Sequence, residues 1–240
     1  MEISKLNNNI TPSGTMAISN KARILKEQGK PVIGFGAGEP DFPTPSHVIE
    51  EVKIASENPA YHKYTAVGGL PILRDEISRT TKKYSNFEID PDNVVVTNGG
   101  KQAILTTFMS LLDPGDEVLI PSPYWTTYPE AVKISGGEPV IVNTDFENDF
   151  KVTVGQLEEK FTEKTKVLVW VSPSNPTGVV YSKEEAEEIY NWAFDKNIWI
   201  LSDELYEHLV YEGVTSPSPA TIDRNFEKTV VVNGVAKAYS

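Results

Sequence analysis

The stretch KVLVWVSPSNPTG, residues 166–178, joins a continuous apolar run to a loop of serine, proline, asparagine and glycine. A run without alternation of apolar and polar residues predicts a strand covered on both faces, as in a parallel sheet. Five further runs share this character, at residues 93–97, 116–121, 138–142, 198–202 and 229–232. Helical patterns separate them. The sequence therefore predicts an α/β fold, doubly wound, with helices covering both faces of a mostly parallel sheet.

Helix start signals support this alternation of strands and helices. Ser13 is a candidate N-cap, and Pro71 suits the first turn of a later helix. Ser182 and Glu185 have the spacing of a capping box, in which each side chain bonds the other residue's backbone. Residues 31–45 are instead rich in glycine and proline, which predicts a loop.

Composition narrows the function classes. The chain has 240 residues, no cysteine and three widely separated histidines, so neither disulfides nor a metal site is expected. Its net charge of −12 argues against nucleic acid or an anionic membrane as a main partner. No apolar run approaches the roughly 18 residues of a membrane span, and the first residues lack a signal-peptide core. We expect a cytoplasmic protein.

Polar and glycine-rich clusters follow five of the predicted strands. They are Asn98-Gly99-Gly100-Lys101, Ser122-Pro123-Tyr124-Trp125, the loop 172–178, Asp203 with Tyr206, and Asn233-Gly234 with Lys237. The carboxyl ends of parallel strands share one edge, where ligands bind in open α/β sheets. Each cluster alone has an ordinary explanation as a turn, a helix cap, a packed aromatic ring or a solvated lysine. Together they predict a ligand site.

The same clusters carry a family resemblance. The matching motifs are AGEPDFPTP (37–45), KYTAVGGLPILR (63–74), GGKQA (99–103), SPYW (122–125), SPSNPTG (172–178), SDELYEHLVY (202–211) and NGVAKAY (233–239). In order and spacing they resemble class I, fold-type I aminotransferases that depend on pyridoxal phosphate. The resemblance spans essentially the whole chain and is strongest to the prokaryotic aspartate aminotransferase branch.

The resemblance implies a domain organisation. Residues 1–45 correspond to an N-terminal arm and the N-terminal part of a small domain, and residues 46–240 to the large domain that binds pyridoxal phosphate. The family's sequences continue well past the residue that matches Lys237. We therefore expect the chain to be the amino-terminal part of such an enzyme, and residues 1–240 alone to be inactive.

The resemblance also assigns catalytic roles. Lys237 resembles the lysine that forms the Schiff base with the cofactor and shuttles the substrate's proton. Asp203 resembles the carboxylate that keeps the pyridine nitrogen protonated. Tyr206 and Asn175 resemble the pair that hydrogen-bonds the cofactor's phenolic oxygen, and the Asn175–Pro176 bond is expected to be cis.

Other residues match cofactor and substrate contacts. Trp125 resembles the ring stacked on the pyridine and facing the substrate, and the amides of Gly100 and Lys101 match the phosphate cradle. Tyr64 resembles the tyrosine that reaches a phosphate in the partner subunit, which implies a homodimer with shared active sites. Gly38 matches the glycine beside the substrate's α-carboxylate, where Asn175 also lies.

The expected reaction moves the amino group of L-aspartate to 2-oxoglutarate. Lys101 and Thr15 match residues that hold the distal carboxylate of such substrates in this branch. Aromatic or prephenate substrates remain alternatives. Two other classes also stay open, namely a pyridoxal-phosphate lyase on the same fold and a domain that binds the cofactor without turnover.

Overall fold

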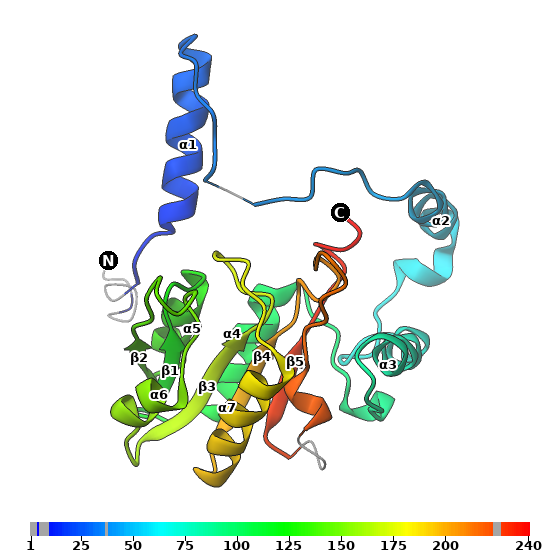
Figure 1. Ribbon diagram of the computed structural model, residues 1–240. Coiled ribbons are helices and arrows are strands. Elements are labelled where there is room, and N and C mark those ends of the chain that lie inside the picture. The colour runs from blue at the N-terminus through cyan, green and yellow to red at the C-terminus, as the bar shows by residue number, and fades with distance from the viewer. Residues whose placement is uncertain (1–3, 5–9, 37, 223–226) are drawn as a thin grey trace.

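The computed structural model describes residues 4, 10–36, 38–222 and 227–240, and its centre is a five-stranded sheet (Figure 1). The strands are β1 (Glu117–Pro121), β2 (Glu138–Val142), β3 (Thr165–Val171), β4 (Trp199–Asp203) and β5 (Thr229–Val232). They lie in the order β2-β1-β3-β4-β5, and every neighbouring pair is parallel. The predicted parallel sheet is confirmed.

Helices cover both faces of this sheet. The helices α4 (Gly100–Leu111), α5 (Thr127–Ile134), α6 (Val154–Lys160) and α7 (Lys183–Asp195) alternate with the strands. Successive residues of β3 point to opposite faces, so Val167 and Val169 pack with α4 and α5 while Leu168 and Trp170 pack with α6 and α7. Two separate apolar cores result, one on each face. This is the doubly wound arrangement that the sequence predicts.

Local signals place several helix ends. Ser182 accepts a hydrogen bond from the Glu185 amide, and the Glu185 side chain accepts one from the Ser182 amide, so the predicted capping box is present. A second capping box, which the sequence analysis did not identify, joins Thr153 and Gln156 at the start of α6. Reciprocal capping satisfies two backbone donors that a helix start leaves without partners.

The prediction of a strand at residues 93–97 is wrong for the described sheet. The structure has a short 3-10 helix, η3 (Pro91–Asn93), followed by extended chain that pairs with no described strand. The Val96 amide donates to the Gly68 carbonyl over 2.9 Å, and Val95 is 66% exposed. An apolar extended segment becomes a strand only when a neighbouring backbone offers a ladder of hydrogen bonds.

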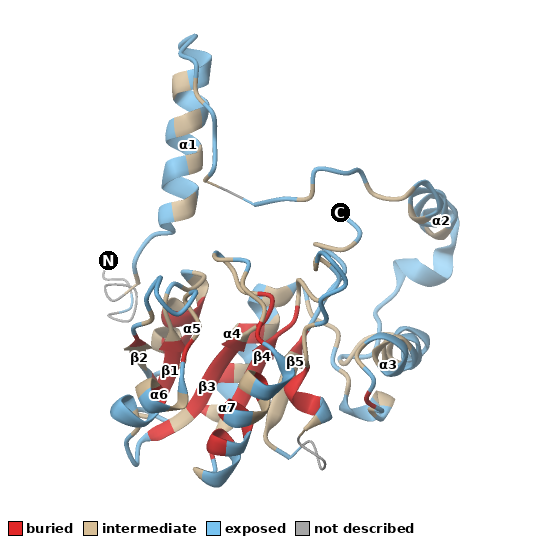
Figure 2. Cartoon of the chain, viewed as in Figure 1, coloured by how far each residue is buried: buried red, intermediate tan, exposed pale blue. Residues whose placement is uncertain are grey.

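The amino-terminal third differs from the rest of the chain. Its helices are α1 (Gly14–Glu27), α2 (Ser46–Glu57) and α3 (Pro71–Tyr84), and they contain no buried residue (Figure 2). Figure 1 shows α1 standing away from the sheet. The proposed boundary at residue 45 stays a prediction. Within the described ranges, no helix is both long and apolar enough to cross a bilayer.

Two further 3-10 turns lie in the described part of the chain, η2 (Pro59–His62) and η4 (Pro219–Thr221). As predicted from the sequence, the Asn175–Pro176 bond is cis, and Ser122–Pro123 and Ser172–Pro173 are cis as well. All three bonds lie just past the carboxyl ends of β1 and β3. These loops form the edge where the polar clusters meet.

Candidate active site

Lys237, Tyr206, Asn175 and Gly38 lie together at the carboxyl edge of the sheet. The Asn175 amide Nδ2 donates to the Tyr206 hydroxyl over 3.1 Å. The Lys237 Nζ donates to the Gly38 carbonyl over 2.9 Å and lies 5.8 Å from the centre of the Tyr206 ring. These contacts join the loop after β3, the turn after β4, the segment after β5 and the loop near residue 38. An amine, a phenol and an amide therefore converge as expected.

Asp203 is a buried carboxylate at the end of β4, with 3% of its surface exposed. Its Oδ2 accepts a hydrogen bond from the Tyr128 hydroxyl over 2.6 Å, and its Oδ1 accepts one from the Leu205 amide over 3.2 Å. Burial raises the pKa of Asp203, while both hydrogen bonds oppose that rise. Burial thus disfavours the charged form of Asp203, and the two hydrogen-bond donors favour it.

Tyr128 is a contact of this site that the sequence analysis missed. It is a fully buried residue of α5. Burial, and then the charge of Asp203, raises the pKa of its phenol well above the usual value, so the hydroxyl keeps its proton and donates. The sequence did offer one indication that Tyr128 lies near the site, because it follows the predicted site residue Trp125 by three positions.

Trp125 and Lys101 extend the same chain of contacts outward. The Trp125 ring meets the Tyr128 ring edge to face, with centroids 5.6 Å apart. The Lys101 Nζ lies 5.7 Å from the Trp125 ring, within cation–π range. Successive contacts therefore connect the exposed Lys101 to the buried Asp203 through the rings of Trp125 and Tyr128.

The start of α4 can hold an anion. Gly99 is its N-cap, with a φ of 80°, and supplies no side-chain cap. Among the described residues, the amides of Gly100 and Lys101 have no backbone acceptor, whereas the Gln102 amide donates to the Gly99 carbonyl over 3.1 Å. The two free amides are suited to binding a phosphate. A Cβ atom at Gly100 would meet Leu205 Cδ1 at 3.0 Å. Glycine therefore lets the helix start pack closely against the turn that carries Tyr206.

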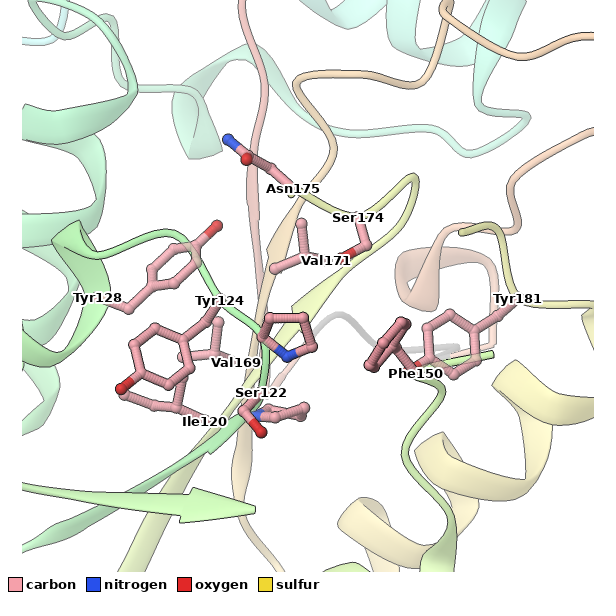
Figure 3. Close-up of a pocket in the computed structure, with 12 residues that line it drawn as sticks. Ile120, Ser122, Tyr124, Tyr128, Phe150, Val169, Val171, Ser174, Asn175 and Tyr181 are labelled. Atoms are coloured by element: carbon pink, nitrogen blue, oxygen red, sulfur yellow. The ribbon is translucent and has the colours of Figure 1, made fainter. Parts of the chain in front are cut away.

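Two hollows flank Asn175. A cavity of about 570 Å³ opens between Gly38, Asn175, Tyr206, Leu209 and Val214, a size typical of small-molecule sites. Figure 3 shows the smaller one, at the carboxyl ends of β1 and β3, with Tyr124 and Tyr128 on one side and Phe150 and Tyr181 on the other. Its volume of about 20 Å³ has room for one water molecule. The larger cavity has the size for a small-molecule ligand and is lined by Asn175 and Tyr206, whereas Lys237 and Asp203 do not line it.

Thr15 and Tyr64 do not join this cluster. Thr15 lies in the first turn of α1, which stands away from the sheet (Figure 1). The Tyr64 side chain, between η2 and α3, is fully exposed at 106%. Their proposed roles stay predictions, and for Tyr64 the predicted contact is with a second copy.

The family assignment follows from sequence comparison. The model of the family described as aminotransferase class I and II matches residues 30–240. The chain belongs to this family.

Within the family, two of the similar relatives are named aspartate aminotransferase. The chain is 53% identical over 232 residues to that of Streptomyces avermitilis, covering 96% of this chain and 57% of the relative. It is 46% identical over 241 residues to that of Bacillus subtilis, covering 100% and 61%. The chain thus spans less than two thirds of these relatives' length.

A solved structure agrees with the fold. The chain superposes on an aspartate aminotransferase from Thermus thermophilus with maleate at a TM-score of 0.93 and 40% identity. The match covers 100% of this chain and 62% of that one.

Proposed function

We propose that the chain binds pyridoxal phosphate and acts in transfer of the amino group of L-aspartate to 2-oxoglutarate. The observation that carries this proposal is the meeting of Lys237, Tyr206, Asn175 and the buried Asp203 at one sheet edge. Because the relatives are longer, the activity is proposed for the full natural polypeptide, whether or not it extends beyond residue 240.

The available donors and acceptors fit the cofactor. The amides of Gly100 and Lys101 would hold its phosphate, and Asp203 would face its pyridine nitrogen. Tyr206 and Asn175 form a ready hydrogen-bonding pair for its phenolic oxygen. When bound, the cofactor supplies an electron sink that stabilises negative charge on the substrate's α-carbon.

The chain's own side chains position and move protons. The Nζ of Lys237 is the amine that would link to the cofactor's aldehyde and would later take the proton from the α-carbon and deliver it to the aldehyde carbon. The Tyr128 hydrogen bond keeps Asp203 oriented and favours its charged form. Trp125 would stack on the pyridine ring and shield it from water.

Substrate choice rests on two kinds of support. Lys101 is a cation at the edge of the site, and Lys101 with Thr15 would bind a distal carboxylate, while Gly38 would lie beside the α-carboxylate. The Thermus thermophilus relative was solved with maleate, a dicarboxylate. Dicarboxylic amino acids are therefore the proposed substrates, and the exposed Tyr64 side chain is consistent with a homodimer that shares its sites.

The test measures glutamate formation from aspartate and 2-oxoglutarate by the full natural polypeptide. Lys101→Ala should lower activity with aspartate far more than activity with phenylalanine or tyrosine. A loss that is equal for all substrates would contradict the role of Lys101 in binding the distal carboxylate. Turnover without any need for a 2-oxo acid would indicate elimination and contradict transamination.

A further inference from the structure

Glu207 is a half-buried carboxylate to which the proposed mechanism gives no role. It follows Tyr206 in the turn after β4, and 18% of its side chain is exposed. Its Oε2 accepts a hydrogen bond from the Ser85 hydroxyl over 2.9 Å, and its Oε1 accepts one from the Asn233 amide over 2.6 Å. Both oxygens are therefore engaged by segments far away in the sequence, and Oε1 also lies 3.4 Å from Nε2 of the adjacent His208.

Asn233 is fixed at both ends of its side chain. Its Nδ2 donates to Glu207, and its Oδ1 accepts a hydrogen bond from the Gly234 amide over 2.7 Å. Asn233 is the first residue after β5, four positions before Lys237. The contact with Glu207 thus holds the residue at which the lysine segment leaves the sheet, while the Lys237 and Ser240 side chains hold its far end through the Gly38 and Phe42 carbonyls.

The turn that carries Glu207 is itself anchored to β5. The Glu207 amide donates to the Glu204 carbonyl over 3.0 Å, and the Glu204 amide donates to the Val232 carbonyl over 2.9 Å. Backbone hydrogen bonds therefore hold the turn after β4 against β5. The start of the lysine segment, at Asn233, is held to that turn through the Glu207 carboxylate. Hydrogen bonds to a charged acceptor are stronger than neutral ones, which suits a single-residue tether.

We propose that Glu207 is a positioning residue for Lys237: through Asn233 it holds the lysine segment against the turn that presents Tyr206. This inference rests on the proposed function in one respect, namely that Lys237 is the amine that links to the cofactor. The positioning itself concerns side chains of this chain alone. It can therefore be measured with and without the cofactor.

The first experiment needs no cofactor. An amine-reactive ester labels the full natural polypeptide, and mass spectrometry follows the rate at Lys237 relative to the exposed Lys183. Releasing the segment frees the Lys237 amine from the Gly38 carbonyl, so Glu207→Ala and Asn233→Ala should each raise its relative rate, by about threefold or more. Ser85→Ala, which removes the partner of the other oxygen, should leave the rate within about twofold.

The second experiment adds pyridoxal phosphate at a fixed subsaturating concentration and traps the link to Lys237 with borohydride. Glu207→Ala and Asn233→Ala should each lower the trapped fraction about tenfold, and the double variant should lose no more than either single one. Glu207→Gln should recover most of the loss, because its amide oxygen can still accept the Asn233 bond.

Several outcomes would overturn the proposal. They are additive effects of the two variants, an equally large effect of Ser85→Ala, no recovery in Glu207→Gln, or unchanged labelling in Glu207→Ala. If no variant, wild type included, carries cofactor on Lys237, the proposed function fails. In that case the labelling rates still decide whether Glu207 positions the lysine.

Discussion

The sheet body, residues 87–240, and the amino-terminal region, residues 10–86, are held together in different ways. Helices α4 to α7 all bury residues against the sheet, whereas α1, α2 and α3 bury none. In the amino-terminal region Phe35 is 92% exposed and Val67 101%. Burial of apolar surface therefore stabilises the sheet body and contributes little to the amino-terminal region within one copy.

This difference separates two groups of candidate residues. Asp203, Asn175 and Tyr206 take their positions from contacts inside the sheet body. Thr15 and Tyr64 lie in a region without such support, and their roles need contacts that a single copy does not provide among the described residues. Gly38 bridges the two groups through its hydrogen bond with Lys237.

The largest effect is expected from Lys237→Ala in the full natural polypeptide. Removing the amine should abolish both the absorbance band of the linked cofactor and the borohydride-trapped adduct, because Lys237 is the amine assigned to that bond. Lys183→Ala, a change at an exposed lysine of the same sheet body, is the matched control. An adduct that persists on another lysine in Lys237→Ala would contradict the assignment.

Asp203→Asn should come next. Loss of a preorganised charge at a site of developing charge typically costs about 3 kcal/mol, a factor of roughly 10²–10³ in kcat. Cofactor binding should largely survive, since the start of α4 is unchanged. Asp195→Asn, at an exposed carboxylate of α7, controls for the loss of one negative charge. A rate within a few fold of wild type would rule out the proposed role.

Core truncation tests the comparison directly. Leu157, with no exposed surface, should lose about 3 kcal/mol of unfolding free energy on Leu157→Ala, because a cavity replaces buried methyl groups. Ile18, at 59% exposure on α1, should lose less than about 0.5 kcal/mol on Ile18→Ala. Urea unfolding measures both. A cost above about 1 kcal/mol for Ile18→Ala would show that this face of α1 is covered in solution.

Glu204 gives the smallest and most specific effect. Burial raises its pKa from 4.5 to about 7, against the opposing hydrogen bonds from Ser218 and Ser202. Ionisation is thus harder in the folded state than in the unfolded state, so this group's stabilising contribution falls as pH rises from about 4.5 through 7.

Glu204→Gln should remove that pH dependence. Relative to the variant, wild type should lose on the order of 2 kcal/mol of unfolding free energy between pH 5 and pH 8. Glu188→Gln, at an exposed position of α7, should keep the wild-type dependence. Identical pH profiles for wild type and Glu204→Gln would contradict the raised pKa.

Much of this arrangement could be predicted from local sequence. Continuous apolar runs such as residues 166–171 identified the five strands, and capping signals such as Ser182 located helix starts. Because parallel strands end at one edge, the order of the clusters along the chain was enough to bring Asn175, Tyr206 and Lys237 together. In these cases the information lies within a few neighbouring residues.

The misses depend on distant partners. Residues 93–97 have the composition of a strand, but a ladder requires a second backbone that no local pattern reveals. The Tyr128 contact with Asp203 spans 75 residues, and the Glu207 contact with Ser85 spans 122. Polar contacts across such separations depend on how helices dock on the sheet, which composition and periodicity do not encode.

The close packing of Gly100 against Leu205 has a consequence for ligand size. It brings the start of α4 against the turn that presents Tyr206, where a methyl group added at Gly100 would lie 3.0 Å from Leu205 Cδ1 and would require that side chain to shift. If the proposed cofactor binds with its phosphate at the start of α4 and its phenolic oxygen at Tyr206, this contact limits the space between the two groups. We therefore expect an analogue with one extra methylene before the phosphate to bind more weakly than pyridoxal phosphate, which a titration of each compound would measure.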